Sequence, residues 1–268
     1  MTVVDTDSNT SDHIPFLRNK GVTAVGRYYS RKAWKRLTRP EAQALSDAGI
    51  EIFTVFEDSG DPELSADRGV HDAQIALQQA TGVGQPQGSA IYFAMEHLPN
   101  GYNASHLPGI RNYYRGLKEV LDGKYRLGVY SDGIVCDALL GEGLCDYAWL
   151  SASSSFPGTR DFDRSGRWAL AQRRVDLNWS HLSIDTKTPR MTSALSALVL
   201  QRLSRSPGLP WRQGRSQRHG RLRPAQPSQP SRTQAGRCWF DGCVPRSGHQ
   251  SPMPALSGRI RSMLMATP

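Results

Sequence analysis

Short apolar runs alternate with amphipathic helical segments through the first 188 residues, and this alternation limits the fold more than any other feature of the sequence. Eight of the runs read as strands: Thr2–Asp5, Val22–Tyr28, Glu51–Phe56, Ala90–Met95, Tyr125–Tyr130, Asp146–Leu150, Trp168–Ala171 and Leu182–Ile184. Several of them are rich in β-branched and aromatic residues and show no polar alternation. Such runs are typical of strands that a parallel sheet buries on both faces.

Helical segments fill the intervals between the early strands. Thr38 and Glu41 have the spacing of a capping box, with Pro40 in the first turn, so a helix is expected to begin there. Two later segments carry an apolar stripe at helical spacing, made of Val70, Ala73, Leu77 and Ala80 in one and of Leu107, Ile110, Tyr114, Leu117 and Leu121 in the other. These segments indicate crossover helices between parallel strands.

The elements follow one another as five β/α units and then three strands. This order predicts an α/β fold, an irregular TIM-like β/α barrel, because eight strands are the number that closes such a barrel. The alternative is an open, doubly wound sheet, which normally carries a glycine-rich phosphate loop after its first strand. Residues 5–9 read Asp-Thr-Asp-Ser-Asn and contain no glycine, so the barrel is the favoured architecture.

The composition changes abruptly after Thr188, and this change divides the chain into two parts. Residues 189–268 contain 13 arginines and no lysine or glutamate, and Asp241 is their one acidic residue. The whole chain has a formal charge of +9, to which this tail contributes +12 and residues 1–188 contribute −3. We therefore predict a barrel domain over residues 1–188 and a basic, low-complexity, disordered tail over residues 189–268.

Two interpretations of this tail remain open. Arginine, proline, serine and glycine in excess, without lysine or glutamate, are what GC-rich codons give in a shifted reading frame, so the tail can be a frameshift product. Alternatively, the tail is an arginine-rich arm that binds the phosphates of RNA or of a membrane surface. The frameshift is the favoured interpretation. Because the barrel domain itself is mildly acidic, nucleic acid is not the expected partner of this chain.

The sequence predicts no membrane span, no cofactor and no resident metal. No stretch approaches the roughly 18–20 apolar residues that cross a bilayer. Residues 1–5 lack the basic and apolar regions of a signal peptide, which predicts a cytoplasmic protein as the sequence is written, or an exported one if a leader lies upstream. Four cysteines are too few for a disulfide scaffold. We expect a monomer.

Polar side chains collect where the predicted strands end, which is where a β/α barrel places its functional groups. Acidic residues stand at or just after five of the strand ends: Asp5, Glu57 with Asp58, Glu96, Asp132 and Asp185. Similar positions hold Arg27, Tyr28, Tyr130 and Gln172. Because the carboxyl ends of parallel strands meet on one rim of a barrel, we expect these side chains to converge in one pocket.

Several carboxylates in one pocket suit the cleavage of glycosidic bonds. One carboxyl group must be protonated to assist the leaving oxygen, and a second must be ionised as base, nucleophile or charge stabiliser. Arg27 can hold one carboxylate ionised or form a structural ion pair instead, and Tyr28, Tyr130 and Trp149 can stack against sugar rings. The same carboxylates together with His97 can alternatively bind a divalent metal.

Several short motifs follow one another in a fixed order along residues 2–187. They are Gly26-Arg27-Tyr28-Tyr29, Leu37–Ala42, Ala48-Gly49-Ile50, Phe56-Glu57, Gly69–Ala73, Ile91–Glu96, Leu127–Ser131 and Tyr147-Ala148-Trp149. This series resembles the bacterial glycoside-hydrolase-like domain common in actinobacteria, which is distantly similar to the family-25 lysozymes (muramidases). The resemblance implies a barrel of five β/α units and three strands. It also implies acidic active-site residues on the first, third, fourth and last strands, which here are Asp5, Glu57, Glu96 and Asp185.

Together these observations predict a glycoside-hydrolase-like protein that acts on, or binds, a bacterial cell-wall or related polysaccharide. Glu96 is the expected acid, and Asp5, Asp185 and Glu57 complete the expected catalytic set. The expected substrate contacts are Arg27, Tyr28, Tyr130, Asp132, Trp149 and Gln172. Two alternatives stay open: a non-catalytic barrel that binds carbohydrate or metal through the same rim, and a protein that binds nucleic acid through its tail.

Overall fold

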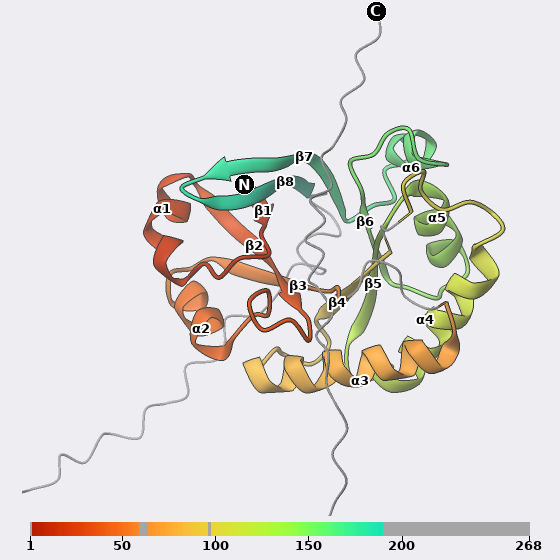
Figure 1. Ribbon diagram of the computed structural model, residues 1–268, viewed down its shortest axis with the longest axis horizontal. Coiled ribbons are helices and arrows are strands. Elements are labelled where there is room, and N and C mark those ends of the chain that lie inside the picture. Colours follow the sequence, from red (N-terminus) through yellow and green to blue (C-terminus); the bar gives the residue numbers. More distant parts are fainter. Residues whose placement is uncertain (1, 59–63, 96–97, 190–268) are drawn as a thin grey trace, which may run out of the picture. The chain divides into compact units, whose positions relative to one another are not determined.

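Eight strands close into one barrel in which each strand pairs with its neighbours in the sequence (Figure 1). The computed structural model describes residues 2–58, 64–95 and 98–189. The strands are β1 (Thr2–Asp5), β2 (Val22–Tyr29), β3 (Glu51–Phe56), β4 (Ala90–Ala94), β5 (Arg126–Ser131), β6 (Tyr147–Leu150), β7 (Leu170–Trp179) and β8 (Leu182–Pro189). Strands β1 to β7 pair in parallel, whereas β8 is antiparallel to both β7 and β1.

Helices follow each of the first five strands and lie outside the barrel (Figure 1). They are α1 (Ile14–Asn19, after the short 3-10 helix Ser11–His13), α2 (Arg39–Asp47), α3 (Ala66–Val83), α4 (Leu107–Leu121), α5 (Gly133–Gly141) and, between β6 and β7, α6 (Thr159–Ser165). The predicted TIM-like barrel of five β/α units and three strands is confirmed. Helix α6 was not predicted, because Phe162 is its one large apolar residue and no helical stripe marks the segment.

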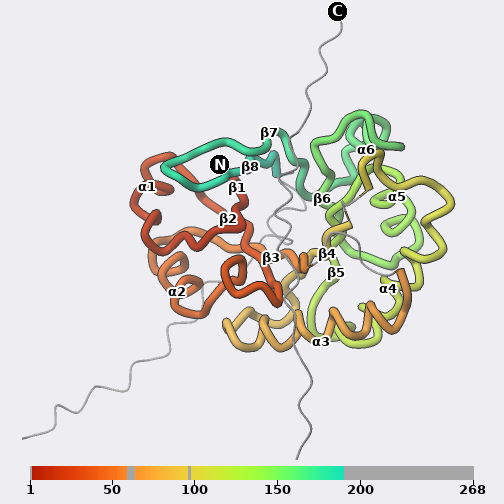
Figure 2. Tube along the Cα trace, in the orientation of Figure 1, coloured from red at the N-terminus to blue at the C-terminus, as the bar shows by residue number. Residues whose placement is uncertain are grey.

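Strands β7 and β8 are longer than the runs Trp168–Ala171 and Leu182–Ile184 that predicted them. Strand β7 continues past the barrel wall and forms a hairpin with the start of β8, whereas the later residues of β8 pair with β1 and close the wall (Figure 2). The added residues of β7 are mostly exposed and polar, so no apolar pattern marks them in the sequence. Ser180 and His181 link the two strands with φ values of 53° and 71°, as the tight turn of a two-residue hairpin requires.

Apolar side chains fill both faces of the barrel wall. The interior holds Val3, Ala24, Phe53, Val55, Ala90, Tyr92, Ala94, Tyr130, Trp149 and Leu170. A larger apolar layer lies between the strands and the surrounding helices. This double burial explains why the strand-forming runs lack polar alternation, and it leaves the ends of the strands as the place for polar groups.

Helices α3 and α4 pack with their backbones in close contact. A Cβ atom at Gly69 would lie 2.1 Å from the carbonyl oxygen of Tyr113, and one at Gly116 would lie 2.0 Å from that of Ala66. Both positions therefore require glycine, and the helix pair forms one layer over the barrel. No helix within the described ranges is both long and apolar enough to span a bilayer.

Candidate functional site

Two carboxylates lie opposite each other inside the barrel wall, on β1 and β8. The register pairs Asp5 with Asp185 across these antiparallel strands and pairs Asp5 with Gly26 across β1 and β2. Opposite residues project to the same face of a sheet, so the two carboxylates are neighbours. A Cβ atom at Gly26 would lie 2.6 Å from both the Asp5 Cβ and the Phe53 ring, so the glycine leaves room for Asp5.

Asp5 is a buried carboxylate held by two donors. Tyr28 Oη donates a hydrogen bond of 2.9 Å to its Oδ2, and Lys187 Nζ forms an ion pair with its Oδ1. Burial raises the pKa of Asp5 against the opposing charge of Lys187, and the charge of Asp185 adds to the increase. Burial and the Asp5 charge also raise the pKa of Tyr28, so its hydroxyl stays protonated and donates.

Asp185 is anchored from three sides. Gln172 Nε2 donates to its Oδ2 over 2.6 Å, the backbone N–H of Asp176 donates to its Oδ1 over 2.8 Å, and Lys187 Nζ lies 3.8 Å from Oδ2. The side-chain Oε1 of Gln172 in turn accepts a hydrogen bond of 2.6 Å from Tyr130 Oη. A continuous polar chain therefore runs from β5 through β7 to β8.

Trp149 lies beneath these polar groups in the barrel interior. Its ring centroid is 4.4 Å from that of Tyr130, and Lys187 Nζ lies 5.0 Å from the ring. The indole Nε1 of Trp149 and the hydroxyl of Ser151 are both buried and have no hydrogen-bond partner within the described part of the chain. Buried donors normally have partners, so these two are available to a polar ligand or a water molecule.

Glu57 lies at the edge of the same set. Its Oε1 is 2.8 Å from Lys35 Nζ, and this ammonium group lies 4.3 Å from the centroid of the Tyr28 ring. The Glu57 side chain is 27% exposed, whereas that of Lys35 is almost fully buried. Through Tyr28, which donates to Asp5, this ion pair joins the carboxylates of β1 and β8.

We call the connected set the mouth cluster. It consists of Asp5, Tyr28, Lys35, Glu57, Tyr130, Trp149, Gln172, Asp185 and Lys187. Seven of these residues were predicted from the sequence, and the two lysines were not. Lys187 lies beyond Ile184, where the predicted last strand ended, although its position two residues after Asp185 puts it on the same face of a strand. Lys35 lies in a loop, where no periodicity marks it.

Arg27 does not join the mouth cluster, contrary to the expectation that it contacts substrate. It precedes Tyr28 on β2 and therefore projects to the opposite face, where its Nε lies 2.7 Å from Glu41 Oε1 and its Nη1 donates to Thr6 O over 2.6 Å. Both charged side chains are fully buried. Thr38 caps α2 as predicted, but Glu41 turns to Arg27, so the ion pair is structural.

Asp132 caps α5 and holds a loop, and these contacts separate it from the mouth cluster. Its Oδ1 accepts from the backbone N–H of Val135 over 3.2 Å, and its Oδ2 accepts from that of Tyr102 over 2.6 Å. Burial raises the pKa of Asp132 to about 6, although both hydrogen bonds act in the other direction. A substrate contact by Asp132 therefore gains no support from its position.

The expected acid, Glu96, and the neighbouring His97 lie outside the described residues. Their roles remain predictions from the sequence, as do the disorder and the nucleic-acid binding of the tail. Within the described ranges, no group of three His, Cys, Asp or Glu side chains is arranged to hold a metal ion.

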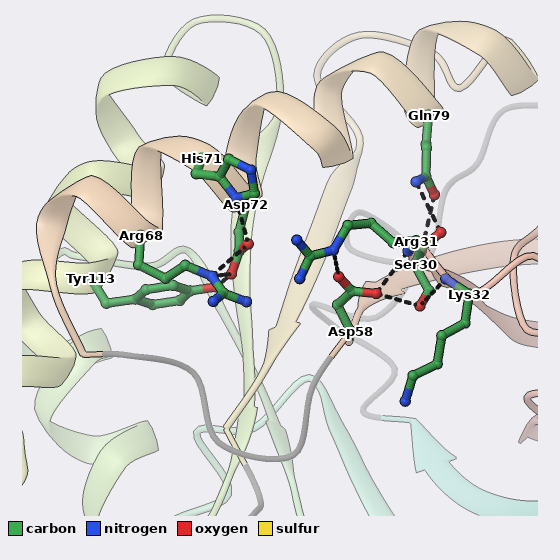
Figure 3. Close-up of polar contacts among 9 residues, drawn as sticks. All are labelled: Ser30, Arg31, Lys32, Asp58, Arg68, His71, Asp72, Gln79 and Tyr113. Carbon is green, nitrogen blue, oxygen red and sulfur yellow. Dashed lines mark hydrogen bonds and ion pairs between the residues drawn. The ribbon is translucent and has the colours of Figure 1, made fainter. Parts of the chain in front are cut away.

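A separate polar network fixes the loop between β2 and α2 (Figure 3). Asp58 accepts from Ser30 Oγ over 2.9 Å and from the backbone N–H of Arg31 over 2.7 Å, and it also pairs with the Arg31 side chain. Gln79 of α3 bonds to both backbone groups of Ser30 at 3.0 Å. Burial opposes ionisation, but these contacts lower the pKa of Asp58. The network anchors the loop that carries Lys35.

A neighbouring network joins α3 to α4 (Figure 3). Arg68 Nε lies 2.8 and 2.9 Å from the two carboxylate oxygens of Asp72, and Tyr113 Oη donates to Oδ2 over 3.1 Å. The buried carboxylate is thus paired with groups from its own helix and the next one, which is the pattern of a structural contact.

Comparisons with known proteins agree with this architecture. The family described as the Rv2525c-like, glycoside hydrolase-like domain matches residues 16–193. The Tat-secreted protein Rv2525c of Mycobacterium tuberculosis, solved in complex with L-tartrate, superposes with a TM-score of 0.61 at 22% identity, over 72% of this chain and 96% of that one. An uncharacterized B. stearothermophilus protein gives 0.55 at 15% identity, over 74% and 99%.

The uncharacterized protein YbfG of Bacillus subtilis (strain 168) is 29% identical in an alignment of 181 residues that covers 61% of this chain. The aligned part is 24% of YbfG, so this chain spans about a quarter of that relative. The family match covers well over half of the sequence and includes most of the strands that carry the mouth cluster. The chain therefore belongs to the Rv2525c-like, glycoside hydrolase-like domain family.

Proposed function

We propose that this domain acts on a bacterial cell-wall polysaccharide, or a related glycan, at the mouth cluster. The family is named for its likeness to glycoside hydrolases, and the motifs of this chain resemble a family distantly similar to muramidases. A glycan fits the chemistry of the cluster, because carboxylates and amides bind sugar hydroxyls and aromatic rings pack against sugar faces.

The observation that carries the proposal is the pairing of Asp5 with Asp185 above Trp149. Cleavage of a glycosidic bond develops positive charge on the sugar ring, and ionised carboxylates beside the ring stabilise that charge. Asp5 and Asp185 both accept hydrogen bonds from protein donors, which suits them to this role. The proton for the leaving oxygen must then come from another group, and Glu96 remains our candidate from the sequence.

Glycan binding without hydrolysis is the second candidate function. It is favoured by one specific observation: Asp5 Oδ2 and both oxygens of Asp185 accept hydrogen bonds from the protein, and Asp5 Oδ1 forms an ion pair with Lys187. Carboxylates held in this way orient a ligand well, but they are less free to attack carbon or to activate water. The two candidates share one site and differ in whether a bond is broken.

Both candidates can be tested together on insoluble peptidoglycan with the full-length chain. Sedimentation measures binding, and the release of reducing ends measures hydrolysis. The hydrolase proposal predicts that Asp5→Asn, Asp185→Asn and Glu96→Gln each reduce the release of reducing ends by about 100-fold or more, in keeping with the loss of a catalytic group. The binding candidate predicts sedimentation without release, weakened in Asp5→Asn and Asp185→Asn.

The matched control is Asp122→Asn, an exposed aspartate that follows α4, at the opposite end of the barrel from the mouth cluster. It should behave like the unchanged protein in both assays. Hydrolysis that persists in Glu96→Gln would refute the assigned acid. Failure of the unchanged protein to bind or to cleave peptidoglycan or other glycans would refute the proposed function.

A further inference from the structure

A buried lysine accompanies the two carboxylates of the mouth cluster. In the antiparallel pairing of β1 with β8, Lys187 is opposite Val3, and Asp185 is opposite Asp5. Lys187 and Asp185 are two residues apart on one strand, so both project into the barrel. Like charges directly opposite each other on neighbouring strands destabilise a sheet, and here they are accompanied by a cation.

The contacts of Lys187 are all made inside the protein. Its Nζ pairs with Asp5 Oδ1, lies 3.8 Å from Asp185 Oδ2 and lies 5.0 Å from the Trp149 ring. The Lys187 side chain has no exposed surface. Burying a lysine is costly unless its charge is compensated, and two carboxylates and an aromatic face supply that compensation.

We propose that Lys187 is the positioning residue of the mouth cluster, holding Asp5 and Asp185 side by side as two charged acceptors. The proposal rests on the proposed function for its catalytic meaning. If Asp5 stays charged, it can stabilise a cationic sugar but cannot donate the proton to the leaving oxygen. Lys187 thereby assigns charge stabilisation to Asp5 and Asp185, and proton donation falls to another group.

The other charged or titratable groups around Asp5 do not take over this task. Tyr28 of β2 donates a neutral hydrogen bond to Asp5. Glu57, after β3, is engaged by Lys35, whose ammonium group lies against the Tyr28 ring. On β8, Asp185 adds a negative charge to the surroundings of Asp5. Among the described residues, the cation in contact with Asp5 is therefore Lys187.

The proposal can be tested without any glycan, by following the side-chain carboxyl ¹³C signals of Asp5 and Asp185 as a function of pH in the full-length protein. In Lys187→Met, which keeps a long apolar stem but removes the charge, the pair should bind its first proton at least tenfold more tightly. Lys187→Arg, which keeps the charge, should restore most of the original titration. Unchanged titration curves in Lys187→Met would overturn the proposal.

A second variant covers the case in which Lys187→Met does not fold, as judged by circular dichroism. With Lys187 intact, Asp185→Asn should lower the proton affinity of Asp5, because it removes the like charge and leaves the cation. No change, or a rise, would contradict the proposed arrangement. Hydrolysis, if present, should show its acidic limb at higher pH in Lys187→Met. If the titration shifts as predicted but the unchanged protein neither binds nor cleaves a glycan, the proposed function is wrong and the positioning role of Lys187 stands.

Discussion

Arg27 and Tyr28 are adjacent in the sequence and serve different layers of the molecule. Tyr28 faces the interior and bonds to Asp5, whereas Arg27 faces α2 and pairs with Glu41. A strand buried on both faces has no polar alternation, so the sequence alone does not tell which of two neighbouring polar residues faces inward. This is why the sequence could not separate Tyr28, which joins the mouth cluster, from Arg27, which forms the ion pair that was its alternative role.

The buried Arg27–Glu41 pair leads to a prediction about stability. Arg27→Met leaves the Glu41 carboxylate buried without its cation, which should lower the free energy of unfolding by about 3–5 kcal/mol. Chemical denaturation monitored by circular dichroism measures the change. Arg126→Met, in an exposed pair with Asp146, is the control and should have a much smaller effect. Equal losses in the two variants would mean that the buried pair has no special structural role.

The raised pKa of Asp132 predicts that the stability of the fold depends on pH. Its pKa is about 6 in the folded chain, against an ordinary value of 3.8, so the folded state binds this proton more tightly than the unfolded state. The resulting contribution, up to about 3 kcal/mol, is fully present below pH 3.8 and is lost as the pH rises through about 6.

Urea denaturation at pH 4 and pH 7 measures this dependence. Asp132→Asn carries no charge at either pH, so it should lose less stability between pH 4 and pH 7 than the unchanged protein. Asp122→Asn, whose side chain is 74% exposed, should keep the original dependence. An equal loss of stability between pH 4 and pH 7 in the unchanged protein and in Asp132→Asn would disprove the prediction.

At the scale of elements, the sequence was most informative where strands and helices are buried. The ends of β1 and β3 agree with their predicted ranges, and α4 begins and ends at Leu107 and Leu121, the first and last residues of its predicted apolar stripe, because apolar patterns report burial directly. The β7–β8 hairpin extends into solvent, where polar residues form strands without an apolar signal. Lys187 lies beyond Ile184 on β8, in a polar segment that pairs with β1 and contains no apolar run, so half of the ion pair at Asp5 was not predicted.

The close contact of α3 and α4 gives a prediction at this scale. Gly116→Ala places a methyl group 2.0 Å from the Ala66 carbonyl oxygen, so the helices must separate, at a cost of about 1–3 kcal/mol. Gly82→Ala is a matched control in α3, since a Cβ there meets no atom within 4 Å. It should be neutral or slightly stabilising, because alanine favours a helix over glycine. The midpoints of thermal unfolding compare the two variants directly.

At the scale of the whole molecule, the barrel explains how residues 180 positions apart become neighbours. Closure of the barrel by β8 brings Asp185 and Lys187 next to Asp5, at the beginning of the chain. The number of strands and their order could be predicted by counting, but the antiparallel direction of β8 and its register could not. These two features decide which side chains meet in the mouth cluster.

The measurement that tests the central claim most directly is the indole N–H signal of Trp149 during titration with a soluble peptidoglycan fragment, recorded by ¹⁵N NMR. The account predicts a saturable shift of this signal. The signal is assigned by its loss in Trp149→Phe, and binding of the fragment should be weaker in Asp185→Asn. The indole of Trp168, which donates to Asp163 O away from the mouth cluster, should not move. Saturable binding of the fragment that leaves the Trp149 signal unmoved would contradict the claim that the mouth cluster is the glycan site.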